Sequence, residues 1–348
     1  MRNRRRLRGA AALAVLCFLT ALTALAGCGR VELPGSLGKD VGLELFGEGK
    51  PRVALITGAE GVEGDYYASA WAALKQIQAE SGAGVAYVEA RTVKDYDARL
   101  LELQKKGADV VITFGANSVA AVAAAAAANP AIQYVVVDAA WRDAIPANLL
   151  VVNYKGEEAG FVAGYLAGSA THSRVLGFIS DRDNALTQRY YAGFRDGGAL
   201  VHSNQEIMKG LAGDGPTRSH IAAMANQMRA NGADVIFHLV GAAASGVIDA
   251  AAGGGDLWLI GSETDQSALA PDKVLCSLVK RHDVVLPPLV IQILETGGGR
   301  EEWVGFDEGG WEITDPDFEN GPLTEDQFNG MLTYRDQVVS GERTVSLE

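Results

Sequence analysis

Residues 107–112 read Gly-Ala-Asp-Val-Val-Ile, and residues 232–237, 125 positions later, read Gly-Ala-Asp-Val-Ile-Phe. In both copies Gly and Asp favour a turn, and the β-branched run after them favours a short buried strand. A helical stretch rich in small residues follows each copy. The repeat indicates two related α/β units, although parallel strands that all draw on Val, Ile and Ala also resemble one another by chance.

Short β-branched runs alternate with longer amphipathic runs on both sides of each copy. This alternation predicts parallel sheets covered by helices on both faces, and two stretches of it predict an α/β protein with two doubly wound parallel-sheet lobes. The strands are predicted at 52–57, 84–89, 109–113, 134–138, 149–153, 174–179, 206–209, 234–238, 258–261, 274–278 and 304–306, and the helices at 65–81, 95–106, 117–128, 155–169, 184–200, 217–231, 243–252, 283–295 and 324–340.

Two acidic residues follow equivalent strands of the two units. The offset of the repeat carries Asp138, at the end of one strand, onto Glu263, at the end of its counterpart. Ligands of open α/β sheets bind outside the carboxyl ends of the strands, so two facing lobes would bring both acids to one cleft. The alternative is that they are solvated strand ends or helix caps.

The first 27 residues read as a secretory signal. Five arginines and no acid precede an apolar run from about residue 9 to 26, and Leu25-Ala26-Gly27-Cys28 resembles the lipobox of bacterial lipoproteins. That resemblance implies cleavage before Cys28 and its acylation, with residues 28–50 as a lipid-anchored flexible tether. We expect the protein on the extracytoplasmic face of the cell membrane, held by the lipid anchor alone. An uncleaved signal anchor is the alternative.

The composition after the signal excludes several partners. Without the five arginines of residues 1–27, the net charge of −13 becomes about −18, which disfavours binding to nucleic acid and to anionic lipid headgroups. Cys17 leaves with the signal and Cys28 is acylated, so Cys276 has no partner for an intrachain disulfide.

Five further segments resemble the basic membrane protein family of substrate-binding lipoproteins, which includes purine nucleoside receptors of ATP-driven importers. The resemblance runs from residue 52 to about 314, and its motifs are YYASAW at 66–71, EEAGFVAGY at 157–165, ADVIF at 233–237, TDQ at 264–266 and SLVKR at 277–281. It implies a type I periplasmic-binding-protein fold, an ABC permease as partner, and a purine nucleoside or related small polar molecule as ligand. It implies neither catalysis nor a cofactor.

The resemblance also suggests ligand-binding residues. In the family's nucleoside receptors an aromatic residue that corresponds to Tyr66 stacks on the base, while an acid and a lysine that correspond to Glu263 or Asp265 and to Lys280 bind the ribose hydroxyls. Three positions differ from the family pattern: Tyr67 replaces an asparagine, the acid before the motif appears as Glu63, and Ala116 stands where an aromatic residue is expected. The expected ligand-binding set is Tyr66, Tyr67, Asn117, Asp138, Glu263, Asp265 and Lys280.

Each of these residues also has an ordinary structural interpretation. Tyr66 and Tyr67 open a predicted helix, where an aromatic side chain commonly covers the local core. Lys280 has Asp283 nearby and could form a surface ion pair. Asn117 enters the set only because it is the polar side chain nearest to Ala116.

Each expected lobe is built from two separate stretches of the chain. We predict an N-terminal lobe of residues 51–145 plus 262–282 and a C-terminal lobe of residues 146–261 plus 283–348, with crossovers near 140–145, 261–267 and 280–282. Closure of the lobes about such crossovers would bury the ligand, and the permease would recognise the closed conformation.

Sequence signals for catalysis are weak. The turn Gly58-x-x-Gly61-x-x-Gly64 lacks both the spacing of a dinucleotide fingerprint and the lysine of a P-loop. The five histidines include no pair at helical metal-ligand spacing, so a dedicated metal site is not expected. We expect a binding protein and no enzyme.

The C-terminal part of the chain points to an alternative function. Thr264-Asp265-Gln266-Ser267, Asp315-Pro316-Asp317-Phe318 and the terminal helix resemble the Med lipoproteins, which are competence-linked regulators of the same family. A regulatory or sensory lipoprotein that kept the binding fold without a transport role is therefore the second interpretation.

Overall fold

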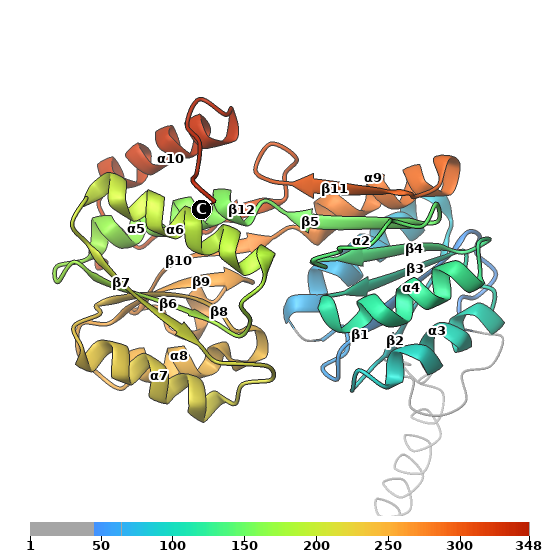
Figure 1. Cartoon of the computed structure of the whole chain (residues 1–348), viewed down its shortest axis with the longest axis horizontal. Coiled ribbons are helices and arrows are strands. Elements are labelled where there is room, and N and C mark those ends of the chain that lie inside the picture. The colour runs from blue at the N-terminus through green and yellow to red at the C-terminus, as the bar shows by residue number, and fades with distance from the viewer. Residues whose placement is uncertain (1–44, 64, 348) are drawn as a thin grey trace, which may run out of the picture. The chain divides into compact units, whose positions relative to one another are not determined.

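Two six-stranded sheets organise the chain. In the computed structural model they belong to two lobes (Figure 1). The structure describes residues 45–63 and 65–347, which belong to one compact unit. The predicted signal, Cys28 and residues 28–44 of the predicted tether lie outside the described residues. No helix within the described part has the length and apolar character needed to cross a bilayer.

The N-terminal lobe is built on a sheet with the strand order β11-β5-β4-β3-β1-β2, in which every neighbouring pair is parallel. Its central strands are almost fully buried because helices cover both faces. The strands are β1 (Arg52–Thr57), β2 (Gly84–Glu89), β3 (Val110–Phe114), β4 (Gln133–Val137), β5 (Leu149–Tyr154) and β11 (Arg300–Val304), and the helices are α2 (Asp65–Ser81), α3 (Asp95–Lys105), α4 (Val119–Ala128) and α9 (His282–Thr296).

The C-terminal lobe repeats this arrangement with the order β12-β10-β9-β8-β6-β7, in which only β12, added to β10, is antiparallel. The strands are β6 (Val175–Ser180), β7 (Glu206–Leu211), β8 (Val235–Leu239), β9 (Trp258–Glu263), β10 (Val274–Lys280) and β12 (Trp311–Ile313). The helices are α5 (Gly156–Ala170), α6 (Ala185–Val201), α7 (Arg218–Ala230), α8 (Ser245–Ala252) and α10 (Glu325–Val339), with single 3-10 turns at Ala116–Ser118, Gly241–Ala244 and Ser267–Leu269.

The structure confirms the predicted fold class, and the two copies of the repeat lie in two α/β units of the same arrangement. The two copies form β3 and β8, which lie at the same place in their sheets, each beside the first and the fourth strand of its lobe. The glycine that opens each copy, Gly107 or Gly232, has a positive φ, of 74° and 100°. Glycine is suited to this turn because it adopts such angles without steric cost.

The predicted lobe boundaries need correction. Strand β5 pairs with β4, and α9 packs on α2 before β11 adds to β5, so these three elements belong to the N-terminal lobe. Strand β10 pairs with β9 in the C-terminal sheet. The reason is that β5 and β10 are buried, so their backbone groups need hydrogen-bond partners. Each strand finds them in the strand that precedes it in the chain, β4 for β5 and β9 for β10.

Two of the three crossovers between the lobes therefore lie at other positions than predicted. One lies at 280–282 as predicted, while the other two lie at 154–156 and 304–311 instead of 140–145 and 261–267. The described end of the predicted tether also differs from a free linker. Phe46 is 5% exposed, and a Cβ at Gly49 would lie only 2.5 Å from the backbone nitrogen of Gly84, so this segment packs against the start of β2.

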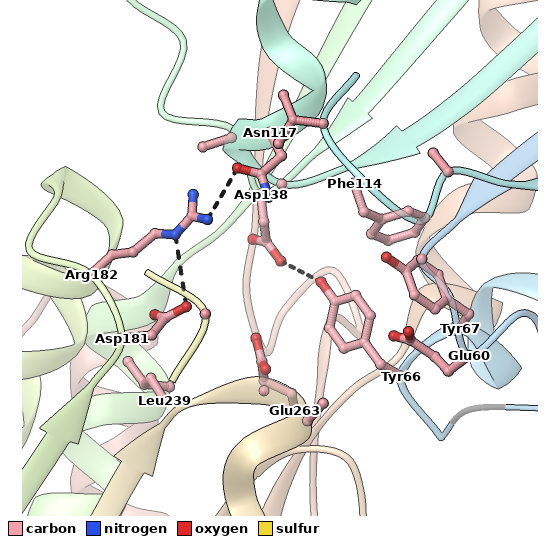
Figure 2. Close-up of a pocket in the computed structure, with 18 of the residues that line it drawn as sticks. Glu60, Tyr66, Tyr67, Phe114, Asn117, Asp138, Asp181, Arg182, Leu239 and Glu263 are labelled. Carbon is pink, nitrogen blue, oxygen red and sulfur yellow. Dashed lines mark hydrogen bonds and ion pairs between the residues drawn. The ribbon is translucent and has the colours of Figure 1, made fainter. Parts of the chain in front are cut away.

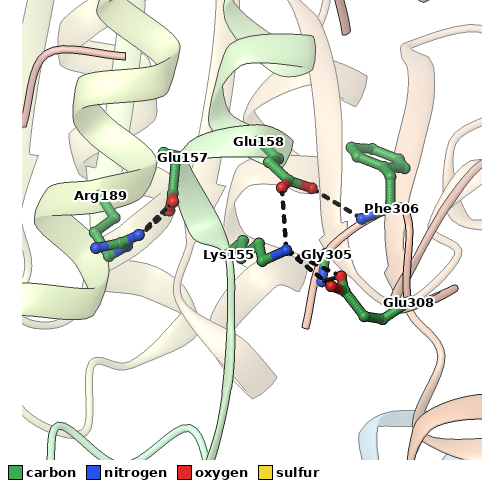
Figure 3. Close-up of polar contacts among 7 residues, drawn as sticks. All are labelled: Lys155, Glu157, Glu158, Arg189, Gly305, Phe306 and Glu308. Atoms are coloured by element: carbon green, nitrogen blue, oxygen red, sulfur yellow. Dashed lines mark hydrogen bonds and ion pairs between the residues drawn. The ribbon is translucent and has the colours of Figure 1, made fainter. Parts of the chain in front are cut away.

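Polar contacts tie two of the crossovers together (Figure 3). The Lys155 ammonium donates to Glu308 at 3.0 Å, and the Glu308 carboxylate also accepts from the backbone N–H of Gly305 at 2.7 Å. The buried carboxylate of Glu158 accepts from the backbone N–H of Phe306 at 2.8 Å. Burial raises the pKa of Glu158 despite this bond and the nearby Lys155. We call Lys155, Glu158, Phe306 and Glu308 the crossover clasp.

Helices α5 and α6 approach closely through glycine. A Cβ at Gly160 would lie 2.1 Å from the carbonyl oxygen of Tyr190, and a Cβ at Gly193 would lie 2.2 Å from that of Glu157. Any larger residue at these positions would force the two helices apart. The close packing fixes the part of α6 that carries Tyr190.

Candidate ligand-binding cleft

A cavity of about 580 Å³ lies where strand ends and loops of both sheets meet. Residues from both lobes line it, among them Tyr66 and Asn117 of the N-terminal lobe and Tyr190 and Glu263 of the C-terminal lobe. Its volume falls within the range of small-molecule sites, and its position at the carboxyl ends of the strands is the usual one for open α/β sheets.

Asp138, Glu263 and Lys280 form an ion-paired group in the wall of this cavity. The Lys280 Nζ atom lies 2.6 Å from Asp138 Oδ2 and 2.8 Å from Glu263 Oε1. The lysine side chain is 3% exposed, while those of the two acids are 15% and 21% exposed. The acids therefore face the cavity and the lysine lies behind them.

The surroundings of Lys280 keep it charged and in place. Burial by itself would lower its pKa, but the carboxylates of Asp138 and Glu263 outweigh that effect and hold the pKa well above its ordinary value. Four aromatic rings also surround the ammonium at 5.3–6.0 Å, which adds cation–π attraction. These rings belong to Tyr66, Tyr154, Tyr190 and Trp311.

Each acid uses one oxygen to hold the lysine. Asp138 Oδ2 also accepts a hydrogen bond from the Tyr66 hydroxyl at 3.3 Å, visible in Figure 2. Within the described part of the chain, Asp138 Oδ1 and Glu263 Oε2 take part in no hydrogen bond. These two oxygens are the acceptors that the group can offer to the hydroxyls of a ligand.

Asp138 and Glu263 share an unusual backbone conformation. Their φ angles are 54° and 66°, in the left-handed region that non-glycine residues seldom adopt. Strained backbone of this kind is concentrated at ligand sites. The shared angle supports the equivalence of the two positions that the repeat predicts.

One wall of the cavity is aromatic (Figure 2). The Tyr66 ring lies edge-on to Tyr67 and to Phe114, with ring centroids at 5.2 and 5.7 Å. Tyr67 is 8% exposed and packs mainly in the core, whereas Tyr66 is partly exposed. Burial raises the pKa of both tyrosines, so both hydroxyls stay protonated donors.

Asn117 is at the cavity as expected and makes a contact across it. Its side-chain oxygen accepts a hydrogen bond at 3.1 Å from Arg182, which follows β6 in the other lobe. Arg182 also lies 3.2 Å from Asp214 and 3.7 Å from Asp181, so carboxylates of its own lobe hold it.

Asp265 is the predicted site residue that the structure does not bring to the cavity. Its carboxylate accepts from the backbone N–H of Ser267 at 2.9 Å in an exposed turn. Among the two acids that sequence left open, Glu263 therefore has the geometry for the site. Cys28 lies outside the described residues.

Sequence reasoning missed several lining residues. Glu60, Phe114, Asp181, Arg182 and Tyr190 all line the cavity. Asp181 and Arg182 directly follow β6, so the rule that ligands bind beyond the carboxyl ends of strands was a usable signal for them. Tyr190 lies inside α6, and no sequence pattern distinguishes it from core residues. No group of three or more His, Cys, Asp or Glu side chains among residues 45–63 and 65–347 could hold a metal ion.

Comparisons with known proteins agree with this architecture. Basic membrane protein D of Borreliella burgdorferi is 32% identical over 190 residues, which cover 53% of this chain and 56% of that protein. The chain thus spans little more than half the length of that relative. The ABC transporter nucleoside-binding protein BmpA of Lactococcus lactis is 26% identical over 267 residues, covering 73% of this chain and 74% of that protein.

The fold is shared more widely. A solute-binding protein of an ABC transporter system from Aeropyrum pernix superimposes with a TM-score of 0.72 at 18% identity, covering 86% of this chain and 94% of that one. Residues 51–344 match the family described as ABC transporter substrate-binding protein PnrA-like, and this match confirms the resemblance found in the sequence motifs. The chain therefore belongs to the family of PnrA-like ABC transporter substrate-binding proteins.

Proposed function

We propose that the chain is the extracytoplasmic receptor of an ABC importer and that it binds a nucleoside in the cavity between its lobes. The observation that carries the proposal is the pair of cavity-facing carboxylates at Asp138 and Glu263, which Lys280 holds in place. Two neighbouring acceptors suit the adjacent hydroxyls of a ribose. The name of the Lactococcus lactis relative supports a nucleoside as the ligand.

The aromatic wall completes the proposed site. Tyr66 donates to Asp138, so its ring lies directly beside the acceptors for the sugar and can stack on a base attached to that sugar. Lys280 is enclosed by rings and carboxylates, so its role is to position the two acids. The binding of sugar and base needs no chemistry on the ligand.

We further propose that Cys28 carries the lipid anchor. The support is the Leu25-Ala26-Gly27-Cys28 sequence after an arginine-rich start and an apolar run. Cys28→Ser should prevent lipid attachment and processing, so that the lipid-modified form found in the membrane fraction of wild-type cells disappears. Processing and membrane retention identical to wild type would contradict the anchor.

The sensory lipoprotein remains the second candidate because of the Med-like segments in the C-terminal part. The two candidate functions differ in whether a metabolite should bind and stabilise the protein. A receptor whose ligand bridges both lobes gains about 2.7 kcal/mol of stability at a hundredfold excess of ligand over its Kd.

A panel experiment tests the proposal. Purified protein is heated with each of the common nucleosides and with a broad metabolite set, and small-angle scattering follows compaction. We expect a nucleoside to raise the Tm and to reduce the radius of gyration. If nothing in either panel changes the Tm or the scattering, the transport function is wrong and the sensory one is favoured.

A further inference from the structure

Asn117 and Arg182 connect the two lobes directly at the cavity (Figure 2). Arg182 follows β6 of the C-terminal lobe, and its guanidinium donates at 3.1 Å to the side-chain oxygen of Asn117, which lies in the 3-10 turn after β3 of the N-terminal lobe. Both residues line the cavity. The protein therefore joins its lobes across the cavity with its own side chains.

This contact lies away from the crossovers. The crossovers leave β5, β10 and β11, whereas β3 is separated from β5 by one strand and β6 from β10 by two. Neighbouring strands lie about 4.8 Å apart, so the lateral offsets are about 10 and about 14 Å. When the lobes turn about the crossovers, a contact at this offset separates further than one beside them. Opening of the cavity must therefore break the contact between Asn117 and Arg182.

The C-terminal lobe holds Arg182 in place. Its Nε atom lies 3.2 Å from Asp214 Oδ1 and 3.7 Å from Asp181 Oδ2. The Thr187 hydroxyl donates to the carbonyl oxygen of Arg182 at 2.9 Å, and Thr187 itself belongs to the capping box at the start of α6. The guanidinium is thus oriented before it meets the other lobe, which lowers the entropy cost of the contact.

The turn that carries Asn117 is fixed as well. The Ser118 hydroxyl donates to the carbonyl oxygen of Gly115 at 2.9 Å, and the Thr113 hydroxyl donates to Ser118 Oγ at 3.0 Å. Asn117 is exposed on this turn, so its amide oxygen is available to a donor from the other lobe. Both partners of the contact are therefore oriented by their own lobes.

We propose that Asn117 and Arg182 are positioning residues that form a latch between the lobes and set how often the cavity opens. We call their hydrogen bond the cavity latch. An amide oxygen suits this role, because it accepts from a guanidinium without carrying a charge, so the bond is weaker than an ion pair and can break repeatedly. The inference goes beyond the proposed nucleoside function and does not depend on which ligand binds.

Double electron–electron resonance between one spin label on each lobe measures the ratio of open to closed molecules. The labels are attached to Ala98→Cys in α3 and Ala223→Cys in α7, both at exposed positions. The full chain also carries Cys17→Ser and Cys28→Ser, while Cys276 stays in place because it is buried and therefore unreactive toward the label. No nucleoside is added, so a failure of the nucleoside function leaves this test intact.

Variants at residue 117 change the latch in both directions. Asn117→Ala removes the acceptor and leaves Arg182 with its own carboxylates, so we expect the open-to-closed ratio to rise about 3- to 10-fold, as for the loss of one hydrogen bond. Asn117→Asp replaces the amide by a carboxylate and should lower the ratio at low salt. About 1 M NaCl should remove most of that decrease, because it screens the new ion pair.

Arg91→Ala is the matched control. Arg91 is also an arginine of the cavity lining, but its side chain is paired at 3.0 Å with Glu89 of the same lobe. We therefore expect Arg91→Ala to leave the open-to-closed ratio unchanged. Melting curves of all variants establish that they are equally folded.

A double variant shows whether the two residues act through each other. Asn117→Ala combined with Arg182→Met should open the cavity no further than the more open of the two single variants, since each of these already breaks the latch. An unchanged ratio in Asn117→Ala would overturn the proposal, as would additive effects in the double variant or equal opening in Arg91→Ala. A decrease in Asn117→Asp that salt does not affect would also contradict it.

Discussion

Asp138 and Glu263 are equivalent residues of the two lobes, and they meet at one lysine. Asp138 directly follows β4 and Glu263 is the last residue of β9, the fourth strands of the two lobes. Both have the left-handed backbone conformation, and each places one carboxylate oxygen within 2.8 Å of Lys280 Nζ. Asp138 belongs to the N-terminal lobe, while Glu263 and Lys280 belong to the C-terminal lobe. The group therefore joins the lobes at the cavity.

Replacing Lys280 should destabilise the protein. Lys280→Met leaves two negative side chains facing each other without their cation, and breaking a buried ion pair on one side costs about 3–5 kcal/mol. Since Asp138 and Glu263 are partly exposed, we expect a loss of about 3 kcal/mol, measured by urea denaturation.

The triple variant is the control for this prediction. Lys280→Met combined with Asp138→Asn and Glu263→Gln has no uncompensated charge, so it should recover most of the lost stability. A single variant as stable as the wild type would show that the ion-paired group does not hold the lobes. A triple variant no better than the single one would point to lost packing instead.

Much of the fold could be predicted because local patterns and long-range packing agree. The predicted bounds of β1, α2 and β2 match the observed ones to the residue. Strand β11 is the main exception, since 304–306 was predicted and Arg300–Val304 is observed. Its charged residues, Arg300, Glu301 and Glu302, reflect an edge strand, whose identity depends on pairing with β5 rather than on its own hydrophobicity.

The lobe boundaries could not be predicted from local patterns. A β-branched run such as 149–154 reads as a buried strand in either lobe, and only the hydrogen bonds to β4 decide where it belongs. The site was predicted where strand ends carry it, at Asp138 and Glu263. Residues that reach the cavity from a helix interior or a loop, such as Tyr190 and Glu60, were missed because tertiary packing brings them there.

Acidification should weaken the fold through a buried histidine. Burial lowers the pKa of His238 from 6.5 to about 4, although its hydrogen bond to Gln266 acts in the opposite direction. The unfolded chain therefore takes up this proton below about pH 6.5 and the folded one only near pH 4. The contribution of His238 to the free energy of unfolding is therefore complete above pH 6.5. Below that pH the free energy of unfolding falls by up to about 1.4 kcal/mol per pH unit.

Urea denaturation at pH 6.5, 5.5 and 4.5 measures this dependence. His238→Asn should reduce the slope between pH 6.5 and 4.5, while His220→Asn, at an exposed position, should leave it unchanged. Equal slopes for His238→Asn and the wild type would mean that His238 is not kept neutral by the fold.

The crossover clasp predicts a graded response at Glu158. Glu158→Ala leaves the backbone N–H of Phe306 without its acceptor and should cost about 1–3 kcal/mol. Glu158→Gln keeps an acceptor oxygen and should retain more of the stability. Urea denaturation compares the two variants, and an equal loss in both would assign the effect to the ion pair with Lys155 instead of the backbone bond.

The most direct test of the central claim is calorimetric titration of one ribonucleoside and its 2′- and 3′-deoxy analogues into the wild type and Glu263→Ala. If Glu263 accepts from the ribose, the wild type should lose affinity for at least one deoxy analogue by the roughly 1.5–3 kcal/mol of a charge-assisted hydrogen bond. Glu263→Ala should discriminate much less, because the hydroxyl and its acceptor act as one unit. The same discrimination in both proteins, or no binding of the ribonucleoside to the wild type, would contradict the account.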